Sequence, residues 1–105
     1  MKRRFILAPE AGFDLVQIWR HIRKNASVEM ADRVESVIRE KLAYLAGNPG
    51  GGHLREDLTN ERVKFFAVYS YLIVYRPETK PLQVVAIVHA HRDLRQLLGE
   101  RPASQ

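Results

Sequence analysis

Three runs of β-branched and aromatic residues, covering residues 62–68, 69–76 and 82–89, constrain the fold of this chain more than any other feature. Such side chains favour strands. Only the segment PETKP, residues 77–81, separates the last two runs, and the first two adjoin each other near residues 67–70. A parallel crossover needs about a dozen residues or more. The three runs therefore predict an antiparallel meander.

Both faces of the central run are apolar, so both faces of the predicted sheet need cover. By the alternation of side chains along a strand, one face carries Tyr71, Ile73 and Tyr75, and the other carries Leu72 and Val74. Apolar surface removed from water contributes about 25 cal/mol per Å², so a wet second face would forgo several kcal/mol. We expect a C-terminal helix over residues 92–98, a partner, or both to cover it.

Two amphipathic segments precede the meander and predict a helical hairpin. In the first, over residues 11–24, one helical face carries Ala11, Leu15, Ile18, Trp19 and Ile22. The second follows Ser27, a suitable N-cap, and its apolar face carries Ala31, Val34, Ile38, Leu42 and Leu45. The short break between the segments favours antiparallel packing. The loop GNPGGG, residues 47–52, ends the second helix.

The N-terminal residues 3–8, RRFILA, predict a short strand that Pro9 ends. A chain of 105 residues is long enough for one core only. The predicted fold is therefore α+β in a single domain over residues 1–98: an N-terminal strand, an antiparallel helical hairpin, a three-stranded antiparallel meander and a short C-terminal helix. Residues 99–105, GERPASQ, predict a disordered tail.

The net charge favours an anionic partner, either nucleic acid or an acidic protein segment. Seventeen basic and twelve acidic residues give +5, and six of the basic residues lie before residue 25, where only two acidic residues are found. The chain has no cysteine, which suits the reducing cytoplasm. The longest apolar run, VVAIV, has five residues, whereas a membrane span needs about 20. We therefore expect a cytoplasmic protein without a membrane span.

The junction between the last strand and the last helix gathers His89, His91 and Arg92. Because His21 and His53 lie far away in the sequence, the pattern does not predict a metal site, and no motif predicts a cofactor. A ribonuclease would need a base, an acid and cations, which Arg62 and these three residues could supply. A structural interpretation is favoured, because an arginine followed by an acid is common at the start of a helix without any catalysis.

The order of these elements, together with four local motifs, resembles the RelE/ParE toxin superfamily of bacterial type II toxin–antitoxin systems. The motifs, in chain order, are APEAGFDLVQIWRHI, LAGNPGGGHLREDL, YLIVYR and VVAIVHAHRDL. The resemblance extends from about residue 3 to residue 98. It implies a toxin held inactive in a hetero-oligomer by a cognate antitoxin, whose C-terminal segment wraps the helical hairpin and the sheet. The expected antitoxin-binding residues are Leu15, Ile18, Trp19 and Ile22, together with the sheet edge.

The resemblance leaves the target of the toxin to be decided. RelE-like members cleave messenger RNA on the ribosome and commonly keep an aromatic residue near the C-terminus, whereas ParE-like members inhibit DNA gyrase without a known catalytic residue set. No aromatic residue follows His89 here. Because base stacking contributes about 1 to 3 kcal/mol, its loss favours the ParE-like branch and no catalytic residues. Tyr69, Tyr71 or Tyr75 could stack instead, so the mRNA endoribonuclease remains the alternative, as does a binding module without toxicity.

Overall fold

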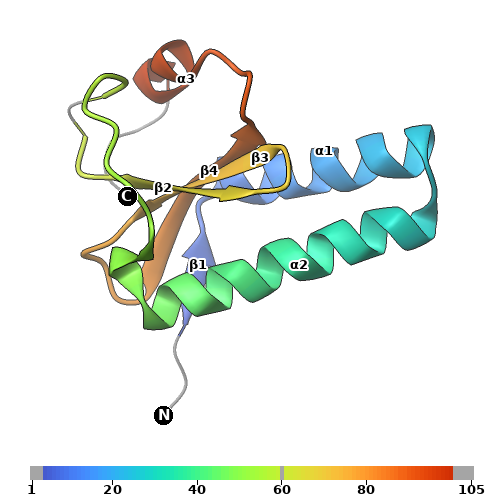
Figure 1. Cartoon of the computed structure of the whole chain (residues 1–105), viewed down its shortest axis with the longest axis horizontal. Helices are drawn as coiled ribbons and strands as arrows, with labels where there is room; N and C mark the ends of the chain where they lie inside the picture. The colour runs from blue at the N-terminus through green and yellow to red at the C-terminus, as the bar shows by residue number, and fades with distance from the viewer. Residues whose placement is uncertain (1–3, 60, 101–105) are drawn as a thin grey trace.

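The computed structural model describes residues 4–59 and 61–100 of the chain and shows an α+β fold, as predicted (Figure 1). In chain order the elements are β1 (Phe5–Leu7), α1 (Pro9–Asn25), α2 (Val28–Gly47), a 3₁₀ turn (Pro49–Gly51), β2 (Lys64–Val68), β3 (Tyr71–Arg76), β4 (Leu82–His89) and α3 (Leu94–Glu100). Within the described ranges, no helix is long and apolar enough to cross a membrane.

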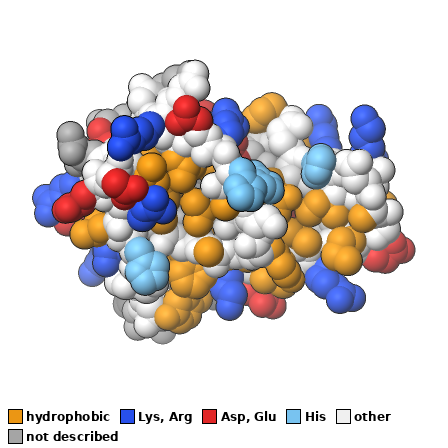
Figure 2. Space-filling view, turned by 45° about the horizontal axis from the view of Figure 1, so that its top comes forward, with side chains coloured by type: hydrophobic (Ala, Val, Ile, Leu, Met, Phe, Trp, Pro, Cys, Tyr) orange, Lys and Arg blue, Asp and Glu red, His pale blue; other side chains and the backbone are white. Residues whose placement is uncertain are grey.

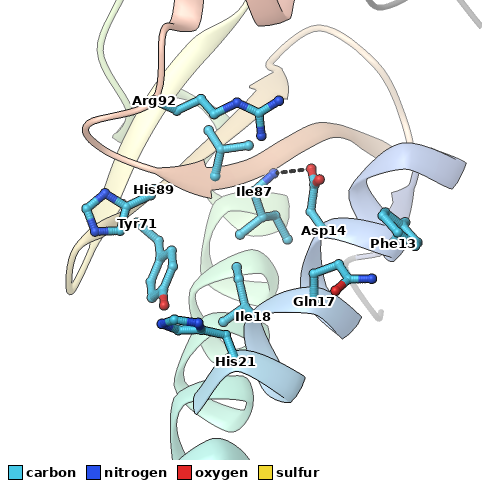
Figure 3. Close-up of a pocket in the computed structure, with 10 residues that line it drawn as sticks. Phe13, Asp14, Gln17, Ile18, His21, Tyr71, Ile87, His89 and Arg92 are labelled. Carbon is cyan, nitrogen blue, oxygen red and sulfur yellow. Dashed lines mark hydrogen bonds between the residues drawn. The ribbon is translucent and has the colours of Figure 1, made fainter. Parts of the chain in front are cut away.

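The four strands form one mixed sheet in the order β1-β4-β3-β2. The three C-terminal strands are the predicted antiparallel meander. The N-terminal strand completes the sheet by pairing in parallel with β4, with Phe5 opposite Leu82 and Leu7 opposite Val84. Because β1 is so short, the remainder of β4, through His89, has α1 rather than a strand beside it on that side (Figure 3).

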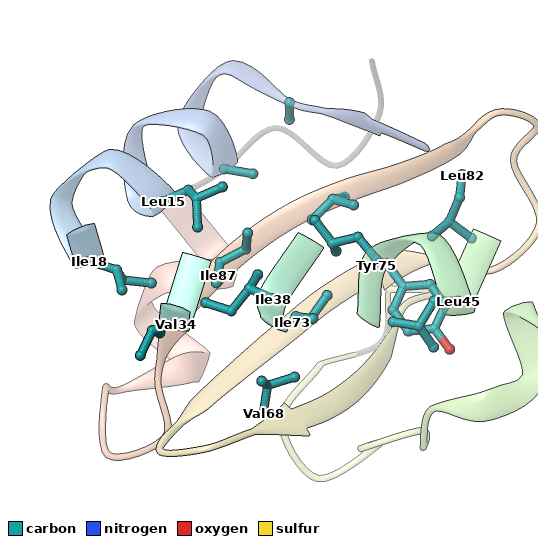
Figure 4. Packing of buried hydrophobic residues seen from close by; sticks show 14 residues of the cluster. Leu15, Ile18, Val34, Ile38, Leu45, Val68, Ile73, Tyr75, Leu82 and Ile87 are labelled. Carbon is teal, nitrogen blue, oxygen red and sulfur yellow. The ribbon is translucent and has the colours of Figure 1, made fainter. Parts of the chain in front are cut away.

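The two long helices form the predicted antiparallel hairpin on one face of the sheet (Figure 1). Pro9 lies in the first turn of α1, and the Ser27 side chain accepts a hydrogen bond from the Met30 backbone N–H at 3.0 Å, which is the expected N-cap. The helices are also linked directly, since the Trp19 indole N–H donates to the Asp32 carboxylate at 2.8 Å. Figure 4 shows the core that this hairpin makes with the sheet, including Leu15, Ile38 and Ile73.

The opposite face of the sheet is covered by α3 and by residues of the loop before β2. A second buried cluster joins Val63, Phe65, Val74, Ala86, Val88, Leu94 and Leu97. A C-terminal helix, a partner, or both were expected from the sequence to cover this face, and the structure shows the C-terminal helix there. The helix starts at Leu94 rather than at residue 92, because the Asp93 carboxylate accepts from the Gln96 backbone N–H and caps it.

The chain boundaries differ slightly from those predicted. The last helix continues through Glu100, so residues 99 and 100 belong to it and not to a tail. The rest of the predicted tail, residues 101–105, lies outside the described residues. Strand β2 starts at Lys64 and not at residue 62. Strand β3 starts at Tyr71 and not at residue 69, because Tyr69 and Ser70 form the turn between the two strands.

The loop after α2 is fixed to the sheet by one buried tyrosine. The hydroxyl of Tyr75, whose side chain is fully buried, accepts from the Gly52 N–H at 2.8 Å and donates to the Pro49 carbonyl at 2.7 Å. A β-carbon at Gly52 would lie 2.6 Å from that hydroxyl, so only glycine fits there. The glycine-rich loop that the sequence identified as a helix stop thus also closes one end of the core.

Candidate functional site

A groove with a volume of about 360 Å³ runs between α1 and the ends of β3 and β4 (Figure 3). We call it the sheet groove. Helix α1 contributes Phe13, Asp14, Gln17, Ile18 and His21, and the sheet with the turn after it contributes Tyr71, Ile87, Val88, His89 and Arg92. Its floor is apolar, whereas histidine and arginine side chains lie along its rim. Figure 2 shows histidine side chains beside hydrophobic ones on this face of the molecule.

Asp14 joins the two walls of the sheet groove. Its carboxylate Oδ2 accepts a hydrogen bond from the Ile87 backbone N–H at 3.0 Å. The donor is open to α1 because β1 ends at Leu7, opposite Val84, and beyond that point no described strand pairs with β4 on the side away from β3. A buried N–H without a partner would be costly, so a carboxylate takes the place of a neighbouring strand.

The two histidines and the arginine of the last junction do lie together, at the end of the sheet groove. His89 Nδ1 accepts from the His91 backbone N–H at 3.1 Å, and the two rings have centroids 5.1 Å apart. The Tyr71 ring meets His89 edge-on at 5.8 Å, and burial raises the pKa of the Tyr71 hydroxyl. The His89 carbonyl accepts from the Arg92 N–H at 3.0 Å. These contacts form a turn that ends β4 and leads towards α3.

Arg62 lies apart from this cluster. It precedes β2, whose first residue Lys64 pairs with Tyr75, whereas His89 pairs with Tyr71 at the other end of β3. Tyr71 and Tyr75 are four residues apart on β3, so Lys64 and His89 are separated by about 13 Å along the strand direction. Arg62 also forms an ion pair with Glu78 at 3.0 Å. The four residues considered for a ribonuclease are therefore not gathered in one place. Across the described ranges, no group of three or more metal-ligating side chains is placed to hold a metal ion.

A second, smaller groove of about 200 Å³ lies on the other side of α1, against α2. We call it the hairpin groove. It is lined by Leu7, Gly12, Leu15, Val16, Trp19, Glu35 and Arg39. The Arg39 guanidinium pairs with Glu35 at 3.1 Å on its rim, and the Arg23 guanidinium lies 5.5 Å from the Trp19 ring centroid. Helix α1 thus has an apolar groove along each flank.

The four residues expected to bind an antitoxin are only partly accessible. Leu15 and Ile18 belong to the core, with 3% and 8% of their surface exposed, and Trp19 and Ile22 are half-buried. The large apolar residues that α1 does expose are Phe13, at 63%, and Val16, at 47%. Sequence reasoning missed these two because it followed only the core-facing repeat. Large apolar residues outside that repeat were the signal that could have identified them.

Comparisons with known proteins give one family match and one structural likeness. The sequence family described as "ParE toxin of type II toxin-antitoxin system, parDE" matches residues 5–94. A solved structure titled "Chromosomal ParDE TA system from P. aeruginosa" superposes with a TM-score of 0.70 and 19% sequence identity, covering 82% of this chain and 94% of the other. At this identity the likeness concerns the fold. No curated protein sequence matches the chain.

Proposed function

Because this chain belongs to the ParE toxin family of type II toxin–antitoxin systems, we propose that it arrests growth by inhibiting DNA gyrase in the cytoplasm and that a cognate antitoxin silences it. ParE-like members of the superfamily act on gyrase, and the family match over residues 5–94 is the observation that carries the proposal. The residues after His89 contain no aromatic side chain that could stack an RNA base, which also favours this target over messenger RNA.

A supercoiling assay tests the target. Purified toxin should block the supercoiling of relaxed plasmid by gyrase, while leaving ribosome-bound messenger RNA intact. The distance between Arg62 and the histidine cluster supports this expectation, because it leaves no compact set of base, acid and cations around a phosphate. If the toxin cuts the message and spares gyrase, the RelE-like endoribonuclease is the correct function.

The antitoxin is proposed to lie along α1, over the sheet groove and the hairpin groove. Phe13 and Val16 would become buried, Trp19 would be covered further, and Leu15 and Ile18 would form the groove floors. Fully burying an exposed valine or phenylalanine contributes about 1.5 to 3 kcal/mol, so these two residues are expected to matter most. An acidic antitoxin would also suit the net charge of +5 that the chain carries.

The chain offers a matched pair of variants for this surface. Val16 and Val28 are equally exposed, at 47%, but Val16 lines the hairpin groove, whereas Val28 lines neither the hairpin groove nor the sheet groove. Val16→Glu should weaken antitoxin binding about 100-fold, because it places a charge in an apolar contact. Val28→Glu, in the first turn of α2, should leave the Kd within about threefold of the wild type. Calorimetry with the antitoxin measures both, and equal affinities would rule out the hairpin groove as the binding surface.

A further inference from the structure

Tyr69 has a backbone conformation that its side chain does not favour. It is the first residue of the two-residue turn between β2 and β3, and its φ is 54°. Among the described residues it is the only one other than glycine with a positive φ. This left-handed region is unfavourable for L-residues with a bulky side chain, whereas Gly and Asn adopt it readily. On grounds of stability alone, Gly or Asn would suit this position better.

No contact within the described chain explains the tyrosine. Its side chain is 62% exposed and makes no hydrogen bond or ring contact with any described residue. The other three tyrosines all have partners: Tyr44 packs against Phe66, Tyr71 against His89, and Tyr75 is bonded to Gly52 and Pro49. An unfavourable backbone that presents an exposed aromatic ring is more typical of a binding site than of a structural turn.

The turn is held rigidly next to the cationic end of the sheet groove. Val68 pairs with Tyr71 across its base, and the Ser70 carbonyl accepts from the Ala90 N–H at 2.8 Å. Tyr69 therefore sits beside the turn that carries His91 and Arg92, both of them exposed. The nearby acidic group of Asp93 is used to cap α3. A rigid tyrosine next to an arginine is the composition found in the energetic centres of protein interfaces.

We propose that Tyr69, with Arg92 and the histidines beside it, is the anchor by which the toxin binds an acidic surface of its target protein, at a site separate from the residues of α1 that take the antitoxin. This inference rests on the proposed toxin function. The partner is a protein and not a nucleic acid, because single-stranded nucleic acids need several free rings and a row of cations. Here one ring is free, the Tyr71 ring packs against His89, and Arg92 is the single arginine in the turn over residues 89–92.

Variants that keep the turn and change only the ring test the anchor. Tyr69→Asn and Tyr69→Gly remove the ring and relieve the backbone, so their Tm should stay at or rise above the wild-type value, by up to about 5 °C. Both should bind the antitoxin with unchanged Kd but inhibit gyrase about 30-fold less well or not at all. Tyr69→Phe keeps the ring and should remain within about threefold of the wild type. Tyr44→Ala, which removes an exposed ring on α2, should remain fully inhibitory.

Each outcome bears on the proposal. If Tyr69→Asn still inhibits gyrase fully, the anchor is overturned. If Tyr69→Asn loses antitoxin binding together with inhibition, the anchor and the antitoxin site are not separate. If wild-type toxin leaves gyrase untouched, the gyrase proposal fails, and growth arrest in cells becomes the readout: arrest lost in Tyr69→Asn supports the anchor, and arrest retained overturns it. A wild-type chain that arrests no growth overturns both proposals. Binding of a single-stranded oligonucleotide that is lost in Tyr69→Asn would replace the protein partner and overturn the anchor as stated.

Discussion

The hydroxyl of Tyr75 is held inside the described chain by two hydrogen bonds. It is buried, donates to Pro49 and accepts from Gly52, so both of its hydrogen-bonding roles are used. Replacing the tyrosine by phenylalanine leaves two backbone groups without a partner. Tyr75→Phe should therefore lower the free energy of unfolding by about 1 to 3 kcal/mol at neutral pH, measured by urea denaturation.

The same tyrosine should make the fold sensitive to alkali. Burial raises the pKa of Tyr75 above its ordinary value of 10.0, although the Gly52 N–H acts in the opposite direction. A raised pKa means that this contribution to stability is complete below pH 10.0 and is lost as the pH rises through the folded-state pKa. Tyr71 behaves in the same sense. Unfolding followed between pH 9 and 11 should thus show a shallower loss in Tyr75→Phe than in the wild type.

Two glycines of one loop should respond to the same substitution very differently. A β-carbon at Gly52 would lie 2.6 Å from the Tyr75 hydroxyl and 2.8 Å from the Phe65 carbonyl, and the latter is fixed backbone. Gly52→Ala should cost about 1 to 3 kcal/mol or more of stability. At Gly50 nothing lies within 4 Å of the added carbon, so Gly50→Ala should change the Tm by only a degree or two. A neutral Gly52→Ala would contradict the packing described here.

Residue roles could be predicted from the sequence only where the partner is close along the chain. The cap Ser27 was identified because it bonds an N–H three residues ahead, whereas the acid at the start of the last helix was expected only as a favourable charge and not as its cap. The roles of Tyr75 and Asp14 were not identified, because their partners come from distant segments that only the fold brings together. The backbone of Tyr69 escaped prediction for a different reason: nothing in its residue type indicates a positive φ.

At the scale of elements, α1 and β4 are joined by Asp14 where a strand is missing. Asp14→Ala would leave the Ile87 N–H without this acceptor and should cost about 1 to 3 kcal/mol. Asp14→Asn keeps an acceptor oxygen and should recover most of that loss. Thermal unfolding of the two variants measures the difference. If alanine and asparagine behave alike, the hydrogen bond to β4 is not what stabilises this junction.

Helix α3 is short, yet it helps to cover one face of the sheet. Leu97 is 3% exposed and packs in the cluster with Val74 and Val88. Leu97→Ala should lower the free energy of unfolding by about 2 to 4 kcal/mol. An exposed neighbour, Gln96→Ala, supplies the control on the same helix, with a change smaller than about 1 kcal/mol, since it keeps the backbone N–H that Asp93 caps.

Elements could be predicted where the pattern is local. The helices follow from their apolar repeat, and the meander follows from connections too short for any other topology. The parallel pairing of β1 with β4 could not be predicted, because it joins the two ends of the chain and depends on the whole core. The exposed face of α1 was likewise missed, since a helical repeat shows which side is buried but not how much of the other side is apolar.

At the scale of the molecule, exposed apolar residues of α1 and the basic junction between β4 and α3 lie on the same face. The chain carries +5 overall, and His21, His89 and Arg92 line the groove beside Phe13. If the partner is acidic, raising the salt concentration from 0.05 to 0.5 M should slow association at least tenfold, because screening removes electrostatic steering. Dissociation should change much less, since buried apolar contacts govern it. Stopped-flow binding of the antitoxin measures both rates, and a salt-independent association would indicate a neutral partner.

The brevity of β1 has a consequence for the chain before it meets any partner. Exposed rows of backbone donors invite strands of other molecules and start aggregates. Beyond Leu7, a helix and one carboxylate occupy the flank of β4 where such a row would otherwise lie open. On this flank, the described part of β4 beyond Val84 therefore does not present a bare strand edge to which another copy of the chain could add.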